Sequence, residues 1–541
     1  MRILLVIIAI SAALYAPVLG LGFVSDDNGL ITHPIAGIAN QSLSTIFTSD
    51  LWHFQESQSG YYRPLMMCSL LLDHTVFGDW AVGYHLQSLL WHLLCVGLIG
   101  LLFGRLMGSI RGSIAAGLYA FHPLVSEQVA FISARNDSMA LAFALAAVWF
   151  AGPKKANPKR CMLACLLAAA ACLSKETGVV VLCLLPLIDW ARHQPFAGWH
   201  RYAALIAGVT GAYFVREMLG PGILHTPAMP GSELVASERM DILAHLLGKL
   251  TWPFPLTDST HIAYLDTLRL TPAIAALFLM VYLTLGGDRW AKVGITFALV
   301  TLIPGLLAIA SRFLIGERYL TLAVLGMAVA IAAIIPKHPK SPWLLVLTLP
   351  WLVGTHDRIT DWSSDLTLAT SAHEAAPTPY TAAWLGHEMA KSGQLEKALP
   401  YFDEATRGTP PTCDFAGEWI RVARDANGST AALDVANTVW ERRCANGPGV
   451  RGEWALTHLK AGDVESAQKI LSPRPTHCTP SLALPVIALS MLEGALEQAK
   501  HCAKTSGVPS SVLKPQVDSL LGGLVNDRNA VTTEDENPSP E

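Results

Sequence analysis

The sequence predicts an all-α protein in which a polytopic helical membrane domain is followed by a domain of helical repeats. Of the 541 residues, 52% are hydrophobic and only 15% are charged, whereas a soluble protein carries about a quarter charged residues. Long apolar segments recur over the first two thirds of the chain, and a periodic pattern of glycine and alanine follows them. The net charge of −4, without clusters of Lys and Arg, argues against a nucleic-acid-binding protein.

The apolar segments predict about 11 membrane spans in a domain covering residues 1–356. The first segment, 3–20, has the roughly 20 apolar residues that a helix needs to cross a bilayer. Because many more segments follow, we interpret it as an uncleaved anchor rather than a signal peptide. The other segments lie near 83–103, 113–133, 137–152, 161–173, 177–190, 201–219, 271–287, 293–310, 318–336 and 342–356.

The distribution of Lys and Arg predicts the orientation. Basic residues are frequent in the loops on the cytoplasmic side of a membrane protein. With a cytoplasmic N-terminus, loops 21–82 and 220–270 and everything after residue 356 lie outside the cytoplasm. We therefore expect a plasma (inner) membrane protein with a periplasmic C-terminal domain. The inner loops would carry Arg105, Arg111, Lys154, Lys155, Lys159, Arg160, Arg192, Arg201, Arg289, Lys292, Lys337 and Lys340.

Residues 357–522 predict a tetratricopeptide-repeat-like domain. Four glycines are separated by 35, 34 and 32 residues, close to the 34-residue period of that repeat. Small residues allow two antiparallel helices to approach, and glycine allows the turn between them. An ordinary antiparallel helical bundle is the alternative interpretation. The glycines are Gly393, Gly428, Gly462 and Gly494, and the first unit also contains Leu385, Gly386, Ala398, Phe402, Ala405 and Pro410.

The end of the chain and its cysteines give two further expectations. Residues 523–541 are polar and acidic, which predicts a disordered tail. Cys413, Cys444, Cys478 and Cys502 fall in the repeat domain, which the orientation places in an oxidising compartment. One or two disulfides are therefore expected there, with the pairing left open.

Polar residues at the outer ends of the spans predict the functional site, because ionisable groups at membrane depth usually mark a site or a pathway. All of them fall on one side of the predicted membrane. Adjacent carboxylates can accept a proton from a hydroxyl or hold a cation, and Arg or Lys at the same level suits a phosphate. This combination predicts group transfer from a phosphate-linked donor to a hydroxyl. The clusters are Asp26 and Asp27; Tyr61, Tyr62 and Arg63; His122, Glu127, Arg135 and Asp137; Lys175 and Glu176; and Glu317 and Arg318.

Each of these residues also has a structural interpretation. The acidic pair Asp26 and Asp27 could end a helix at the water interface, and Tyr61 and Tyr62 could belong to an aromatic belt. Arg135 and Asp137 could pair to hold two spans together. Two further structural interpretations are that His85 and His92 are hydrogen-bonded packing residues and that Lys175 and Arg318 are interfacial cations.

The order of the motifs resembles the transmembrane-and-TPR O-mannosyltransferase family, a branch of the GT-C glycosyltransferases. The motifs cover most of residues 1–330, and the repeats extend the resemblance over nearly the whole chain. Ser88 stands where the family has Asn, and the compact loops are typical of a bacterial member. The motifs are FVSDDNGLI, YYRPL, HLQSLLWHLL, FHPLVSEQVAFISARND, LSKETGVVVLCLLPLIDW and ERYLTL.

The resemblance implies an inverting enzyme that transfers a sugar from a polyprenyl-phosphate donor to Ser or Thr hydroxyls of proteins outside the cytoplasm. Asp26 or Asp27 would be the catalytic base. Donor phosphate and sugar would be held by Arg63, Glu127, Arg135, Asp137, Lys175 and Arg318, with support from Tyr62, His85, His92, His122, Glu176 and Glu317.

The cofactor and partner expectations follow from the same chemistry. No cofactor is required, because basic side chains can neutralise the phosphate, although a divalent ion between Asp26 and Asp27 is compatible with the sequence. The repeat domain would present or dock an extracytoplasmic protein or peptide. Two alternatives stay open: the same chemistry on a lipid or cell-wall glycan acceptor, and a non-catalytic scaffold or transporter that uses its repeats for assembly.

Overall fold

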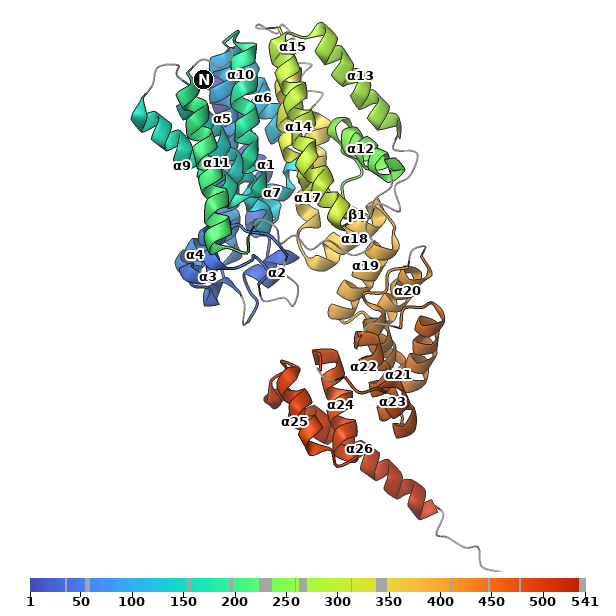
Figure 1. Cartoon of the computed structure of the whole chain (residues 1–541). Helices are drawn as coiled ribbons and strands as arrows, with labels where there is room; N and C mark the ends of the chain where they lie inside the picture. Colours follow the sequence, from blue (N-terminus) through green and yellow to red (C-terminus); the bar gives the residue numbers. More distant parts are fainter. Residues whose placement is uncertain are drawn as a thin grey trace, which may run out of the picture. The chain divides into compact units, whose positions relative to one another are not determined.

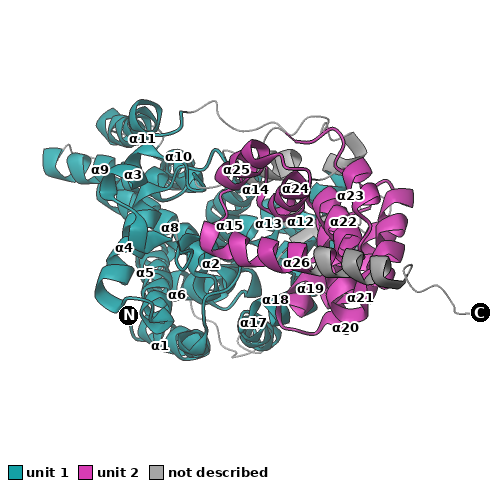
Figure 2. Cartoon of the chain, turned by 90° about the horizontal axis from the view of Figure 1, so that it is seen from below, with its two compact units in different colours: residues 1–371 teal, residues 372–541 magenta. Residues whose placement is uncertain are grey.

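The computed structural model describes two compact units, residues 1–371 and 372–541, which Figure 2 distinguishes by colour. Its described residues are all those of the chain except 35–36, 54–58, 153–156, 195–197, 223–235, 258, 262–269, 313, 337–347, 409–410, 446–447, 476–477 and 535–541.

The first unit is a bundle of helices, as the sequence predicts. Its long helices run alongside one another, and the short helices α2 and α3 lie with α4 at one end (Figure 1). In chain order the α-helices are α1 (Arg2–Tyr15), α2 (Asp26–Leu30), α3 (Leu43–Thr48), α4 (Pro64–Phe77), α5 (Ala81–Met107), α6 (Ser109–Ala120), α7 (Glu127–Ala130), α8 (Arg135–Ala151), α9 (Pro158–Ser174), α10 (Val181–Ala191), α11 (Trp199–Leu219), α12 (Ala236–Thr251), α13 (Leu270–Gly286), α14 (Arg289–Arg312), α15 (Thr321–Ile334) and α17 (Leu349–Asp361).

Short elements complete this unit. Strands β1 (Ser259–His261) and β2 (Leu314–Gly316) pair antiparallel, with Ser259 opposite Gly316. The 3₁₀ helices relevant to the site are η1 (Ala16–Gly20), η3 (Pro123–Val125), η4 (Ile132–Ala134), η5 (Glu176–Val180) and η8 (Glu317–Leu320). The all-α class predicted from the sequence is therefore confirmed, with one two-stranded ladder added.

Small residues let the helices of the bundle approach closely. A Cβ atom added at Gly112 on α6 would lie 2.2 Å from the backbone nitrogen of Gly104 on α5. At Gly326 on α15 it would lie 2.6 Å from the nitrogen of Ala298 on α14. Within a membrane, helices associate through such close packing because lipid offers no hydrophobic gain for association.

Three of the described helical segments are long and apolar enough to cross a membrane: Arg2–Gly20, Ala81–Met107 and Glu317–Ile334. The count of about 11 spans therefore stays a prediction. The last predicted span, 342–356, falls partly outside the described residues.

The predicted span 113–133 is wrong as a single helix. Helix α6 ends at Ala120, and the chain continues through η3, α7 and η4 before α8 begins at Arg135. Pro123 has no backbone N–H, so an uninterrupted helix would lose a hydrogen bond there. Irregular backbone at membrane depth is tolerated only where protein surrounds it, and residues 121–135 are all buried.

The second unit consists of consecutive helices joined by short turns. Gly393, Gly428, Gly462 and Gly494 all adopt positive φ, between 75° and 84°, which explains the periodic glycine because other residues are strained in this region. The tetratricopeptide assignment itself stays a prediction. The helices are α19 (Pro379–Lys391), α20 (Leu395–Arg407), α21 (Ala416–Glu441, kinked at Gly428), α22 (Pro448–Lys460), α23 (Val464–Ile470), α24 (Pro480–Leu492), α25 (Leu496–Thr505) and α26 (Ser510–Glu534), while α18 (Asp365–Ala375) crosses the boundary between the units.

The structure shows the disulfide pairing of the second unit and the conformation of the chain after residue 523. Disulfides join Cys413 to Cys444 and Cys478 to Cys502, which fixes the pairing that the sequence left open. The tail predicted to be disordered from residue 523 is helical as far as Glu534, because α26 continues there. Leu524 is buried in the core of this unit and holds that part of the helix.

Candidate functional site

The two adjacent aspartates differ completely in their surroundings. Both open α2, directly after the first apolar segment, but Asp26 is exposed whereas only 1% of Asp27 is accessible. The Asp27 carboxylate accepts hydrogen bonds from the backbone N–H of Ile132 (3.3 Å), the backbone N–H of Ser133 (2.8 Å) and the Ser133 hydroxyl (2.5 Å). Asp27 therefore satisfies the donors of the irregular segment that interrupts the predicted span.

Burial raises the pKa of Asp27 to about 7, although the Ser133 hydrogen bonds oppose the shift. A buried carboxylate loses hydration, which penalises its charged form more than the hydrogen bonds stabilise it. A carboxyl group in this setting is well suited to hold the η4 turn. It is poorly placed to meet a substrate, because protein surrounds it.

Asp365, a residue that the sequence did not indicate, fixes the segment before the acidic pair. Its carboxylate accepts a hydrogen bond from the Ser25 backbone N–H at 2.6 Å and from the Asn28 side-chain amide at 3.1 Å. Ser25 has φ +58° and ψ −127°, a conformation that is costly for a residue other than glycine. Asp365 thus stabilises the strained turn from which Asp26 projects.

A small cavity of about 50 Å³ brings Asp26 together with predicted phosphate-binding residues. Among the residues that line it are Asp26, Arg63, Lys175 and Arg318, which lie far apart along the chain. Its wall also includes the aromatic side chains Trp52, Tyr61, Phe131 and Tyr319. A cavity of this size holds only a few water molecules.

Each of the three cations is paired with an acid that the sequence also indicated. Lys175 Nζ donates to both oxygens of Asp137 at 2.6 Å, and both side chains are buried. Arg318 Nη1 donates to Glu127 Oε1 at 3.0 Å. These pairs hold the cations at the cavity wall, so that little side-chain entropy remains to be lost when an anion binds.

The third pair joins Arg63 to Glu176. Arg63 donates from Nε and Nη2 to Glu176 Oε2 at 3.3 Å, and its guanidinium lies 4.4 Å from the centre of the Tyr61 ring. Burial opposes ionisation of Glu176, but the Arg63 charge and other positive charges hold its pKa below the ordinary value. A guanidinium has five N–H donors, so the pairing of Arg63 with Glu176 uses only part of its donor capacity.

Arg135 is not among the residues that line this cavity, and its role in binding the donor stays a prediction. It is completely buried, and its guanidinium donates to Asp73 Oδ2 at 2.5 Å. The structural pairing of Arg135 with Asp137 is wrong, because Asp137 binds Lys175. The remaining acceptors of Arg135 are Ser88 (3.0 Å), Ser69 (3.2 Å), Gln87 (2.5 Å) and the Tyr84 carbonyl (2.6 Å). Ser88, which replaces the family's Asn, is therefore a partner of this arginine.

The predicted supporting residues fall into the packing around the cavity. Tyr62 donates from its hydroxyl to the Phe47 carbonyl at 2.9 Å. His85 Nε2 lies 3.2 Å from the Gly22 carbonyl, and His92 Nε2 lies 3.1 Å from the Ser11 hydroxyl. These contacts support the interpretation of both histidines as hydrogen-bonded packing residues.

The other two supporting residues also have protein partners. His122 Nδ1 accepts a hydrogen bond from the Leu124 backbone N–H at 3.3 Å and its ring contacts Trp351. Glu317, immediately after β2, accepts from Lys249 Nζ at 2.5 Å. It therefore anchors the turn that carries Arg318 into the cavity wall.

Asp73 and Lys249 are charged partners of predicted site residues, and only Asp73 could have been recognised from the sequence. Asp73 interrupts the apolar run MMCSLLLDHTVF, and an acidic residue in such a run is expected to have a buried partner. Lys249 carries no such signal, because the sequence of α12, ASERMDILAHLLGKLT, already contains several charged residues. Among the residues that the structure describes, no three His, Cys, Asp or Glu side chains converge as a metal site requires.

Part of the chain is similar in sequence to known O-mannosyltransferases. A sequence model of the family "Dolichyl-phosphate-mannose-protein mannosyltransferase" matches residues 64–210. The chain is 31% identical to "Protein O-mannosyl-transferase Tmtc1" of Drosophila melanogaster over 187 residues, which is 34% of this chain and 22% of the relative. The predicted family resemblance is confirmed.

Longer alignments extend the similarity to the transmembrane-and-TPR O-mannosyltransferases beyond the matched domain. The chain is 24% identical to "Protein O-mannosyl-transferase F38B6.6" of Caenorhabditis elegans over 70% of this chain and 58% of the relative. It is 25% identical to "Protein O-mannosyl-transferase TMTC3" of Homo sapiens over 77% of this chain and 52% of the relative. The chain thus spans less than two thirds of these relatives, and no solved structure matches it. The membrane-capable helices and these relatives together identify a membrane protein.

Proposed function

We propose that this protein is a glycosyltransferase that moves a sugar from a polyprenyl-phosphate carrier to Ser or Thr hydroxyls of proteins. The observation that carries the proposal is the cavity in which Asp26 meets Arg63, Lys175 and Arg318. A carboxylate beside three cations supplies both functions that such a transfer needs, namely a base for the acceptor and positive charge for the leaving phosphate. The names of the relatives favour a protein acceptor and mannose.

In the proposed reaction Asp26 is the general base, and Asp27 positions it. Asp26 takes the hydroxyl proton as the acceptor oxygen attacks the anomeric carbon of the sugar. The bond from that carbon to the phosphate oxygen breaks, and the electron pair leaves with the polyprenyl phosphate. Attack from the face opposite the phosphate inverts the anomeric centre.

The three cations neutralise the charge that develops on the phosphate as it leaves. Arg63 and Arg318 suit this role because a guanidinium can engage phosphate oxygens at two points. No metal is required in this scheme, since the side chains supply the positive charge. The cavity of about 50 Å³ must widen to admit a sugar headgroup, so we expect donor binding to rearrange its wall.

Purified full-length protein with polyprenyl-phosphate mannose and a Ser/Thr-rich peptide tests the chemistry. Asp26→Asn is expected to lower kcat by about 10²–10⁴-fold, the usual contribution of a general base. Asp79→Asn is the matched control, because Asp79 is 82% exposed on the turn after α4 and does not line the cavity. Full activity of Asp26→Asn would contradict the base assignment.

The acceptor and the sidedness need experiments in cells. Mass spectrometry of surface and secreted proteins, with and without the gene, should reveal a lost hexose-sized addition on Ser or Thr. A loss confined to lipid or cell-wall glycan would contradict a protein acceptor. A reporter in place of the second unit, fused after Ser371, should report an extracytoplasmic position, whereas a cytoplasmic signal would reverse the proposed topology.

A further inference from the structure

A second and larger cavity lies in the first unit, at the far end of helices that also reach the cavity lined by Asp26. It measures about 360 Å³, within the range of small-molecule sites. On α5, His85 contacts the Gly22 carbonyl just before Asp26, and Arg105 near the other end of that helix lines the second cavity. Twenty helical residues span about 30 Å, which is the thickness of the hydrocarbon core of a bilayer. In the topology proposed above, the two cavities would therefore lie at opposite faces of the membrane.

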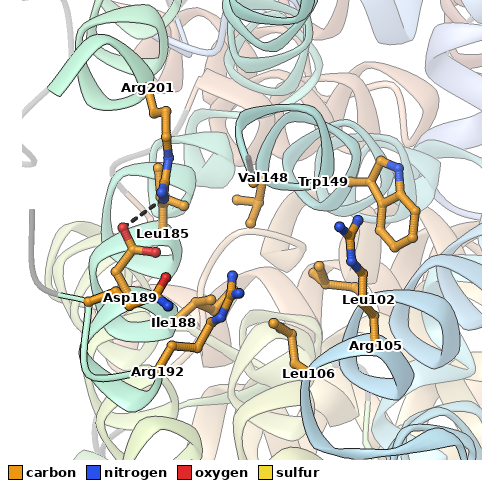
Figure 3. A pocket seen from close by; sticks show the side chains of 12 residues that line it. Leu102, Arg105, Leu106, Val148, Trp149, Leu185, Ile188, Asp189, Arg192 and Arg201 are labelled. Atoms are coloured by element: carbon orange, nitrogen blue, oxygen red, sulfur yellow. Dashed lines mark hydrogen bonds and ion pairs between the residues drawn. The ribbon is translucent and has the colours of Figure 1, made fainter. Parts of the chain in front are cut away.

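Basic and aromatic side chains surround this second cavity. Arg105 from α5 and Arg192 just after α10 are exposed, and both line the cavity. The Arg105 guanidinium lies 5.3 Å from the centre of the Trp149 ring. Figure 3 shows Arg192 and Asp189 on one side of the cavity and Arg105 and Trp149 on the other. Arginine and tryptophan are the residues that membrane proteins place at the level of lipid headgroups.

The cavity also contains hydrogen-bond acceptors. Asp189, of which 1% is accessible, uses Oδ2 to accept from Arg201 at 2.6 Å and from the Tyr202 hydroxyl at 2.5 Å. Its other oxygen, Oδ1, is buried and has no hydrogen-bond partner among the described residues. The side-chain oxygen of Gln194 is also buried and has no hydrogen-bond partner among the described residues. Buried acceptors without a donor are costly, and they mark positions where a ligand can donate.

We propose that this cavity binds the headgroup of a membrane phospholipid that carries both a phosphate and a hydrogen-bond donor. Arg105 and Arg192 would bind the phosphate, and Asp189 Oδ1 with Gln194 would accept from the donor. Phosphatidylethanolamine has an ammonium donor and phosphatidylglycerol has hydroxyl donors. Phosphatidylcholine has the same phosphate but no donor. Leu102, Leu106 and Ile188 also line the cavity and would contact the apolar part of such a lipid.

Native mass spectrometry of the full-length protein in detergent measures this selectivity directly. The probes are phosphatidylethanolamine, phosphatidylglycerol and phosphatidylcholine with identical acyl chains. Phosphatidylethanolamine is expected to bind about tenfold more tightly than phosphatidylcholine, which has the same net charge but no hydrogen-bond donor. Equal affinity for phosphatidylethanolamine and phosphatidylcholine would overturn the proposal, because these two lipids have the same net charge and differ in the hydrogen-bond donor, whereas phosphatidylglycerol also differs in charge.

Variants separate the phosphate contacts from the donor contacts. The double variant Arg105→Ala and Arg192→Ala should lose about tenfold in affinity for the preferred lipid, and both residues are exposed, so the fold should survive. Gln194→Ala should lower the preference over phosphatidylcholine. Arg289→Ala is the control, because this arginine packs on Trp190 near the same helix end without lining the cavity.

These lipid-binding measurements do not depend on sugar transfer by the protein. Unchanged lipid binding in the double variant would overturn the phosphate assignment, and so would an equal loss in Arg289→Ala. Water-soluble glycerophosphoethanolamine identifies the source of the phosphate. If it displaces the lipid at the same concentration as the lipid itself, the site is one for soluble phosphodiesters and the assignment to a membrane lipid is wrong.

Discussion

The buried pair of Asp73 and Arg135 allows a quantitative test of whether Arg135 stabilises the fold or binds the donor. Neither side chain is exposed, and Arg135 donates to Asp73 and to four neutral acceptors. Asp73→Asn keeps an acceptor of nearly the same shape but leaves the guanidinium without its counter-ion. Breaking a buried ion pair in this way costs about 3–5 kcal/mol, a large part of the 5–15 kcal/mol that stabilises a typical protein.

The assay is thermal unfolding of the purified full-length protein, followed together with the KM for the polyprenyl-phosphate sugar. Asp79→Asn serves as the control, because an exposed carboxylate of this kind contributes within about 0.5 kcal/mol. In an Arg135→Met background the change Asp73→Asn should become neutral or stabilising, since no buried positive charge then needs a partner. If Asp73→Asn unfolds like the wild type but raises the KM for the donor, Arg135 binds the donor and the structural assignment is refuted.

Three further predictions concern the acidic pair and the cavity wall. Burial raises the pKa of Asp27 from 3.8 to about 7, so the contribution of Asp27 to stability is full below pH 4 and is lost as the pH rises through 7. Asp27→Asn should remove this part of the pH dependence of thermal unfolding. An unchanged pH profile in this variant would contradict the raised pKa. Arg318→Ala should raise the KM for the donor about tenfold with little change for the peptide, whereas equal changes would exclude the phosphate role. Asp365→Ala should lower kcat by on the order of tenfold because Ser25 loses its acceptor, and Asp365→Asn should restore part of it; unchanged kcat in Asp365→Ala would rule out a positioning role.

Some features of the fold were predictable because they depend on local sequence. Apolar segments indicate helices at membrane depth, and the regular glycines of the second unit are the positions with positive φ. The interruption of the predicted span 113–133 was less visible, although Pro123 marks it. Asp27, more than a hundred residues earlier, accepts hydrogen bonds from two of its backbone N–H groups.

The candidate site was predictable as a set of residues but not as an arrangement. Charges at membrane depth are costly enough to be noticed one by one, and Asp26, Arg63, Lys175 and Arg318 do line one cavity. Arg135 is also a charged residue at predicted membrane depth, but it binds Asp73 and does not line this cavity. The cost of burying a charge shows that a partner must exist, but it does not show which partner.

The sequence by itself determined that this is an all-α membrane protein with charged residues at the ends of its apolar segments and regularly spaced glycines after them. The tertiary structure decided that Asp26 rather than Asp27 faces the cavity, that Glu127 binds Arg318 across 191 residues, and that Cys413 pairs with Cys444. The physical reason is the distance along the chain over which each interaction acts. Hydropathy and backbone preference act within a helix, whereas ion pairs, hydrogen bonds and disulfides form between side chains that only the folded chain brings within a few ångströms.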